Sequence, residues 1–106
     1  MPETISLKRY AQAIFQIASE REEVGIWEKD LSYLSDTIQT VQLTKILDSP
    51  QIPSQKKHSL IRDLFEKSVN PLAINLISLL SSRNSASSIG TISTEFTRLI
   101  DLYKNV

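Results

Sequence analysis

The stretch from Asn70 to Asn84, NPLAINLISLLSSRN, decides the fold of this chain. Apolar side chains fill most of it, interrupted in the middle by Asn75 and Ser78 alone. Asn70 can cap the start of a helix, and Pro71 suits the first helical position, where its missing N–H costs nothing. The stretch therefore predicts a helix that begins at Pro71.

The helix expected over about residues 71–83 is apolar around more than half of its circumference. On a helical wheel its apolar side chains cover an arc of roughly 220°, whereas an ordinary surface helix has a stripe of ~100°. The run is too short to span a bilayer, which takes ~20 apolar residues. We expect a central helix of a bundle, covered on more than one side. A short buried strand is the alternative, because Ile74 and Ile77 are β-branched.

Composition limits the class of protein. The 106 residues suit one domain that can fold around its own core, and only two glycines and four prolines occur, which favours helices over a β-sandwich or barrel. Cysteine is absent, which excludes disulfides, thiol catalysis and cysteine-based zinc sites. The formal net charge is zero, which argues against nonspecific nucleic-acid binding, because such binding needs a basic face.

Five further segments have the three-and-four spacing of apolar residues that is typical of helices. They run from about Ser6 to Arg21 with Thr4 or Ser6 as the cap, from Glu22 or Val24 to Thr40, from Val41 to Leu47, from Pro53 or Ser54 past Phe65, and from a serine cap near residues 85–88 to Tyr103. The last helix is expected to start nearer Thr91, because Gly90 costs about 1 kcal/mol in a helix interior. The sequence therefore predicts an all-α fold, a six-helix bundle in which residues 1–106 form a single domain.

The third, fourth and sixth predicted helices each have an apolar stripe that is expected to be buried. Their buried candidates are Leu43, Ile46 and Leu47 in the third helix, Leu60, Ile61, Leu64 and Phe65 in the fourth, and Ile89, Ile92, Phe96, Leu99, Ile100 and Tyr103 in the sixth. The lysines and arginines of the fourth helix are expected to lie largely outside the core.

No signal peptide is expected at the N-terminus. The sequence MPETISLKRY lacks the basic region and apolar run of a signal peptide, and no segment is a transmembrane candidate. At the other end, no glycine or closing turn follows the last apolar stripe before Lys104-Asn105-Val106. This ending is typical of one domain of a longer protein truncated after residue 106, with a natural terminus as the alternative.

Residues that could catalyse a reaction or bind a metal do not form a recognisable site. His58 is the only histidine, and a surface or half-buried structural role is the simpler explanation for it. A metal site would need carboxylates alone, and Asp30, Asp36 and Asp48 fall on different turns or elements. The chain has no nucleophile-elbow motif and no glycine-rich phosphate loop. We therefore expect no catalytic residue, no metal ligand and no cofactor.

Two features have both a structural and a functional interpretation. Lys56, Lys57, Arg62 and Lys67 could form a basic patch, but a solvated face of the fourth helix explains them more simply. Trp27 falls at the buried phase of its helix and is expected in the core, although a buried aromatic residue near a groove can report on binding.

Two helices have more apolar surface than a single core contact uses. The first presents Tyr10, Ala13 and Ile17 beyond its core stripe, and the fifth presents Leu72, Leu76 and Leu79 beyond Ile77 and Leu80. If the two helices are neighbours, these surplus faces line one groove, which would accept an amphipathic partner helix. The alternative is that the remaining helices cover both surplus faces.

A series of short motifs runs through the chain. They are Arg9-Tyr10-Ala11-Gln12-Ala13-Ile14-Phe15 with Ala18, Trp27 with Asp30-Leu31, Leu47 with Ser49-Pro50, Lys57, Asn75-Leu76-Ile77 with Leu79-Leu80, and Phe96 with Leu99. In this order and spacing they resemble the delta subunit of bacterial rotary ATP synthase, the mitochondrial oligomycin sensitivity conferral protein. The first motif is moderately specific and the ordered set is much more so. The resemblance covers the whole chain but only the N-terminal domain of the family.

The resemblance implies a six-helix bundle on top of the catalytic head of ATP synthase. It implies a noncatalytic stator link, which keeps the head from turning with the rotor so that torque drives ATP synthesis. The N-terminal helix of an alpha subunit would lie in a groove between helices one and five, and the C-terminal part of the family would join the b subunit of the peripheral stalk. The implied location is peripheral, on the cytoplasmic face of the bacterial inner membrane, without membrane insertion and without nucleic acid.

The family's groove can be transferred residue by residue. It would use Tyr10, Ala13, Ile14 and Ile17 with Asn75, Leu76 and Leu79. One departure concerns the Gly-Arg pair that usually follows helix five, where this chain has Arg83-Asn84-Ser85-Ala86. Because of this departure the loop after helix five can differ in conformation from that of the family, whereas the fold is much less affected.

Two other classes of function remain as alternatives. An RNA-binding all-helical module, similar to transcription antitermination factors, would need an exposed face of lysines and arginines. A small helical enzyme would need carboxylates that converge in a deep pocket. Neither pattern is visible in the sequence.

Overall fold

The computed structural model describes residues 2–40 and 42–104, and over these residues it is all-α. Its helices are α1 (Pro2–Glu20), α2 (Val24–Thr40), α3 (Leu43–Leu47), α4 (Ser54–Phe65), α5 (Pro71–Ser82) and α6 (Ile89–Lys104), with a short 3-10 helix, η1 (Ala86–Ser88), before α6. The predicted all-α fold with six α-helices is thereby confirmed. None of the helices in the described part of the chain is both long enough and apolar enough to cross a bilayer.

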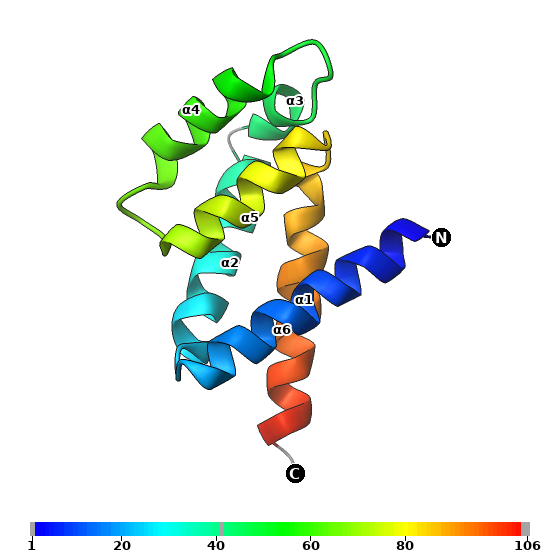
Figure 1. The fold of residues 1–106 in the computed structure, drawn as a ribbon, viewed down its shortest axis with the longest axis vertical. Helices are drawn as coiled ribbons and strands as arrows, with labels where there is room; N and C mark the ends of the chain where they lie inside the picture. Colours follow the sequence, from blue (N-terminus) through cyan, green and yellow to red (C-terminus); the bar gives the residue numbers. More distant parts are fainter. Residues whose placement is uncertain (1, 41, 105–106) are drawn as a thin grey trace.

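The helices form a bundle in which α2 and α6 pack most extensively against each other (Figure 1). Helix α1 crosses α6, and α4 packs along α5 at the periphery. Helix α5 also contacts α2 and η1, so its apolar surface is covered on more than one side, as its wide apolar arc predicts.

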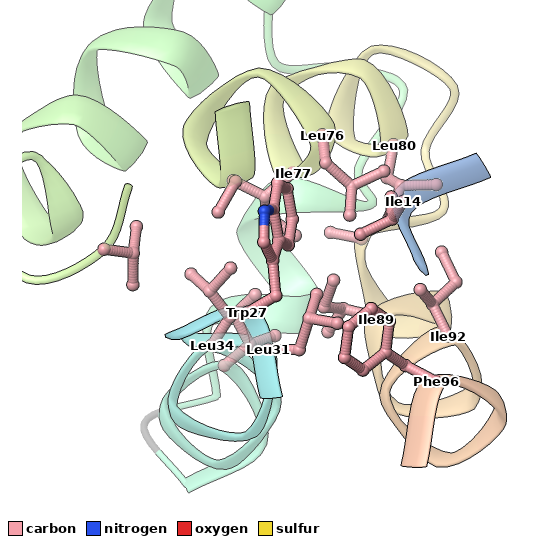
Figure 2. Close-up of a cluster of buried hydrophobic side chains, with 14 of the residues drawn as sticks. Ile14, Trp27, Leu31, Leu34, Leu76, Ile77, Leu80, Ile89, Ile92 and Phe96 are labelled. Carbon is pink, nitrogen blue, oxygen red and sulfur yellow. The ribbon is translucent and has the colours of Figure 1, made fainter. Parts of the chain in front are cut away.

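The core lies between α2, α5 and α6, with α1 closing one side (Figure 2). Its labelled members are Ile14 from α1, Trp27, Leu31 and Leu34 from α2, Leu76, Ile77 and Leu80 from α5, and Ile89, Ile92 and Phe96 from α6. Helix α1 reaches this core through two alanines, Ala11 and Ala18, which are both fully buried. Such small side chains let a neighbouring helix approach closely.

The structure corrects two predicted helix starts. Helix α1 begins at Pro2, because proline is favoured at the first helical position, so Thr4 and Ser6 lie inside the helix and are not its caps. Helix α6 begins at Ile89 and contains Gly90. A Cβ at Gly90 would lie only 3.1 Å from Nε2 of Gln39, so the glycine lets α6 approach α2 closely.

No serine caps η1, the short helix that precedes α6. Ser85 precedes η1 but makes no side-chain cap hydrogen bond. The carboxylate of Asp48, far away in the sequence, accepts hydrogen bonds from the backbone N–H groups of Ala86 and Ser87 instead. A carboxylate is favourable at a helix N-terminus, where the first N–H groups have no partner within the helix.

Three predicted core residues are on the surface. Ile46 and Leu64 are exposed, because α3 buries only Leu43 and Leu47 and α4 turns Ile61 and Phe65 inward. Tyr103 is 63% exposed, although its ring stacks on Phe15 with centroids 5.1 Å apart. Val41, the predicted start of the third helix, lies outside the described residues.

The loop after α5 forms a Schellman turn. Asn84 has a left-handed φ of 57°, the backbone N–H of Ser85 donates to the Leu80 carbonyl (2.8 Å), and that of Asn84 donates to the Ser81 carbonyl (3.0 Å). Asparagine tolerates this conformation better than most residues that have a side chain. The departure at the Gly-Arg pair is therefore compatible with an ordinary helix end.

Asn84 also binds a buried lysine, which corrects the expectation that Lys57 lies outside. Lys57 is 2% exposed, and its Nζ donates to Oδ1 of Asn84 (2.7 Å) and to the backbone carbonyl of Ser81 (3.2 Å). An ammonium group is favourable there, because the carbonyls at a helix C-terminus carry partial negative charge. Lys57 therefore joins α4 to the end of α5.

The start of α5 is held in a similar way by α2. Asn70 caps α5 as predicted, with its side-chain oxygen accepting from the Ala73 N–H (3.0 Å). The buried carboxylate of Asp30 accepts from the backbone N–H (2.9 Å) and the side-chain amide (3.0 Å) of Asn70. Both ends of α5 are thus fixed by side chains from other helices.

Replacing Glu22 with glycine should stabilise the protein. Glu22 has a left-handed φ of 56° just after α1, a conformation that costs a residue with a Cβ roughly 1–2 kcal/mol and glycine little. We expect Glu22→Gly to raise the free energy of unfolding by about 1 kcal/mol in urea denaturation followed by Trp27 fluorescence. Glu23→Gly, at a neighbouring position without positive φ, should give no gain. An unchanged or lower stability of Glu22→Gly would contradict this reasoning.

Replacing Lys57 with methionine should destabilise the protein. The variant keeps the apolar stem but removes both hydrogen bonds from the ammonium group, and a hydrogen bond to a charged group contributes about 1.5–3 kcal/mol. We expect a loss of about 2–3 kcal/mol in the free energy of unfolding. The control is Lys56→Met at the exposed neighbouring position, which should change stability by less than about 0.5 kcal/mol. Equal effects of the two substitutions would show that the buried contacts contribute nothing.

Candidate partner-binding groove

Helices α1 and α5 lie on the same face of the bundle and run in opposite directions (Figure 1). They make few direct contacts, far fewer than α1 makes with α6 or α5 makes with α4. Ile14 of α1 lies near Leu76 and Leu80 of α5 in the core (Figure 2). The two helices therefore converge on a shared apolar base without packing tightly along their length.

The seven predicted groove residues differ in exposure, so they would divide into a base and two walls. Ile14 and Leu76 are buried, at 7% and 8% exposed. On the α1 side, Tyr10 is half-buried, Ala13 is exposed and Ile17 is 38% exposed, while on the α5 side Asn75 is exposed and Leu79 is 41% exposed. Ile14 and Leu76 thus belong mainly to the core and can form only the base of a groove. The other five residues have surface that a partner could cover.

Sequence periodicity explains which residues take these places. On α1, the buried residues follow the three-and-four spacing: Ala11, Ile14 and Ala18. Ile17 directly precedes the buried Ala18. On α5, Leu79 stands one position before the buried Leu80. A step of one residue rotates a side chain by about 100°, so both lie beside the core stripe and not within it.

Sequence reasoning missed a hollow of about 560 Å³ on the other side of α1, where it meets α6. The hollow is lined by Gln12, Phe15, Gln16, Ser19, Glu20, Leu99 and Tyr103. It shares no residue with the predicted groove. The predicted stripe of α6 includes Leu99 and Tyr103, but no sequence signal indicated that Phe15 would stack on Tyr103.

The ionisable residues in the described part of the chain have structural contacts. Among the described residues no three His, Asp or Glu side chains are placed to hold a metal ion. His58 is half-buried, and its Nε2 lies 2.8 Å from Oγ of Ser82 and 3.2 Å from the carbonyl oxygen of Ser78, which matches the structural role expected for it. Its contacts add a second link between α4 and α5.

Glu95 on α6 has a shifted pKa for a structural reason. Arg98 donates to its carboxylate, with Nε 3.0 Å from Oε2, and this hydrogen bond holds the pKa of Glu95 below its ordinary value. The charges of Arg98 and Lys8 act in the same direction, and partial burial opposes them. A lowered pKa keeps the carboxylate ionised, which is typical of an ion pair and not of a general acid.

The basic patch considered for the fourth helix is smaller than its sequence indicates. Lys57 is buried, which leaves Lys56, Arg62 and Lys67 as the exposed cations. Helix α4 also presents Leu64 and Asp63 to solvent, so its outer surface is mixed in character. No observation in the described part of the chain specifically favours RNA binding.

Trp27 is buried as predicted and reaches from α2 toward Ile77 of α5 (Figure 2). Its Nε1 has no hydrogen-bond partner among the described residues. Because this indole lies directly against the helix that carries Leu76 and Leu79, its fluorescence is suited to detect changes at α5.

Comparison with known proteins gives one consistent result. Residues 7–106 match the family model described as ATP synthase delta (OSCP) subunit. Similar curated proteins include ATP synthase subunit delta of Shouchella clausii (32% identical over 99 residues, covering 92% of this chain and 55% of the relative), of Dehalococcoides mccartyi strain 195 (30% over 98 residues, 92% and 53%) and of Nitrosomonas eutropha (35% over 81 residues, 76% and 46%). The chain spans about half the length of the curated relatives it matches. No solved structure matches it with significance.

The distinction between wall and base can be tested by stability. Leu79→Gln removes a side chain that is already 41% exposed, so the free energy of unfolding should fall by less than about 1 kcal/mol. Leu80→Ala removes a buried side chain at the next position and should cost about 2–5 kcal/mol. Urea denaturation of both variants provides the measurement. A large loss for Leu79→Gln would show that this residue belongs to the core.

Proposed function

Because the chain belongs to the ATP synthase delta (OSCP) subunit family, we propose that it is a noncatalytic stator component whose α1–α5 surface binds the N-terminal helix of an alpha subunit. In this role it links the catalytic head to the peripheral stalk. The link keeps the head from turning with the rotor, so that torque drives ATP synthesis.

The observation that carries this proposal is the pair of exposed apolar walls above a buried apolar base. Ile17 and Leu79 stand on neighbouring antiparallel helices that hardly touch each other. An amphipathic helix laid between them would cover both side chains. Complete burial of one such side chain contributes about 1.5–3 kcal/mol before the cost of ordering the partner.

The small residue at the centre of the α1 wall supports a helix as the partner. Ala13 is exposed and lies one turn from Ile17 on the same face of α1. A methyl side chain at this point leaves room for another backbone to approach, as small residues do where helices pack closely. Asn75 on the opposite wall can hydrogen-bond a polar side chain at the partner's edge.

The remaining proposed partners follow from the family alone. We assign contact with the b subunit of the peripheral stalk to the C-terminal part of the subunit, beyond these 106 residues. The corresponding location is peripheral, as part of ATP synthase on the cytoplasmic face of the bacterial inner membrane. Membrane insertion, nucleic acid and cofactors have no part in this proposal.

Replacing Ala13 with aspartate should abolish binding of the partner helix. The proposed complex buries this position, and burying an unpaired carboxylate costs several kcal/mol, so affinity should fall roughly 100-fold or more. The measurement is titration with a synthetic peptide of the alpha-subunit N-terminal helix from the same organism, followed by Trp27 fluorescence and by calorimetry.

The matched control is Gln12→Asp, which places the same charge on the neighbouring exposed residue of α1, at the hollow on the other side. It should bind the peptide like the unmodified protein. Circular dichroism should show that both variants remain helical. Unchanged affinity of Ala13→Asp, or an equal loss with Gln12→Asp, would exclude the α1–α5 surface as the binding site.

A further inference from the structure

The C-terminal end of α6 lies beside the hollow between α1 and α6 and carries exposed apolar side chains. Leu102 and Tyr103 in its last turn are 53% and 63% exposed. Tyr103 lines the hollow, and its ring stacks on Phe15 of α1. Figure 1 shows this end of α6 extending past the point where α1 crosses it. The described helices therefore leave apolar surface incompletely covered at this end of the bundle.

The hollow has an apolar interior and a polar edge. Leu99 is buried and Phe15 is half-buried, and together with Tyr103 they provide the apolar surface. Gln12 and Ser19 of α1 are exposed and line the edge. The volume of about 560 Å³ is enough for several side chains. This arrangement suits a short polypeptide segment, whose apolar side chains would fill the interior while its backbone could hydrogen-bond to the polar edge.

The hollow is too small to hold a separate protein by itself. Seven residues line it, whereas a stable interface between two chains uses about 20–30 residues on each side. A segment of the same chain needs much less contact, because the covalent connection raises its effective concentration to about the millimolar range. The size of the hollow therefore favours an occupant that is tethered to the domain.

The C-terminal part of the subunit, proposed above to lie beyond these 106 residues, is such an occupant. The chain spans about half the length of the curated relatives it matches. We propose that in the full-length subunit the segment following Val106 turns back and places apolar side chains in the hollow, against Phe15, Leu99 and Tyr103. The distance to cover is short, because Tyr103 itself lines the hollow and each extended residue adds about 3.3–3.6 Å.

A docked segment would fix the direction in which the C-terminal part leaves the domain. A free linker lets two parts of a chain reorient, whereas a segment packed against two helices is held in place. This consequence rests on the proposed function, in which a stator link has to resist torque. The docking itself does not involve the α1–α5 surface, since the hollow shares no residue with the predicted groove.

The test uses the full-length subunit with the substitution Ser19→Cys at the edge of the hollow. Residues 1–106 contain no cysteine, and any cysteine beyond them is replaced by serine. The rate at which the new thiol reacts with a maleimide is compared with that in a version whose segment after Val106 is a flexible glycine–serine sequence of equal length. If the native segment occupies the hollow about 90% of the time, the thiol should react about tenfold more slowly than in the glycine–serine version.

The matched control is Ser59→Cys, at an exposed position of α4. Its thiol should react equally fast in the two versions, and circular dichroism should show that both remain helical. Equal rates for Ser19→Cys in the two versions would overturn the proposal. If both rates are low and rise on dilution, a second copy of the protein fills the hollow instead.

A substitution at Tyr103 tests whether the segment lies in this hollow. Tyr103→Ala removes aromatic contact surface, so with the native segment it should raise the rate at the Ser19→Cys thiol by a factor of about 3 or more. The control is Tyr33→Ala on α2, which removes another exposed tyrosine whose ring contacts one phenylalanine (6.0 Å between centroids). It should leave the rate unchanged.

Two results with these tyrosine variants would contradict the proposal. One is an equal effect of Tyr103→Ala and Tyr33→Ala, and the other is an effect of Tyr103→Ala of the same size in the glycine–serine version. Titration with the alpha-subunit peptide reports separately on the α1–α5 surface. Failure of the proposed docking therefore remains distinguishable from failure of the proposed function.

Discussion

The structure depends on how the apolar surface of α5 is covered. Helix α4 packs on one side of α5, and α2 and η1 contact it from the core, where Ala73, Ile77 and Leu80 are buried. The side toward α1 is different, because α1 meets α5 only at its base. A helix with apolar residues over so wide an arc needs cover in several directions, and this bundle leaves one of them incompletely covered. That shortfall is the physical origin of the proposed groove.

Several helix ends are held by polar side chains from distant parts of the sequence. Lys57 binds the C-terminal end of α5, Asp30 binds its N-terminal cap, and Asp48 binds the first N–H groups of η1. Each binds backbone or amide groups at a helix end, where the first N–H groups and the last carbonyls have no partner within the helix. These contacts fix α5 at both ends. Both ends of the helix that carries Leu79 are therefore held by side chains of α2 and α4.

The local sequence was sufficient to predict the helices, the burial of Trp27 and the cap at Asn70. These features depend on the spacing of apolar residues and on hydrogen bonds between near neighbours in the chain. It failed for Lys57 and Asp48, whose partners are 24 or more residues away and whose roles exist only once the helices have packed. It also misplaced Ile46 and Leu64, since an amphipathic pattern does not show how many neighbours a peripheral helix has. For the proposed groove, the pattern identified the surplus apolar faces of α1 and α5 but did not distinguish the buried Ile14 and Leu76 from the exposed residues beside them.

Substitutions at the buried and at the exposed residues of the proposed groove should have different effects on the fold. Ile14 and Leu76 are core residues that form the base of the proposed groove, so we expect a substitution there to alter folding and binding together. Ile17, Ala13 and Leu79 are exposed, so we expect their replacement to change affinity for the proposed partner with little effect on stability. Because the base of the proposed groove is part of the packed core, we expect the shape of the groove to be set before a partner arrives. Binding would then require ordering of the partner alone, which reduces the entropic cost of association.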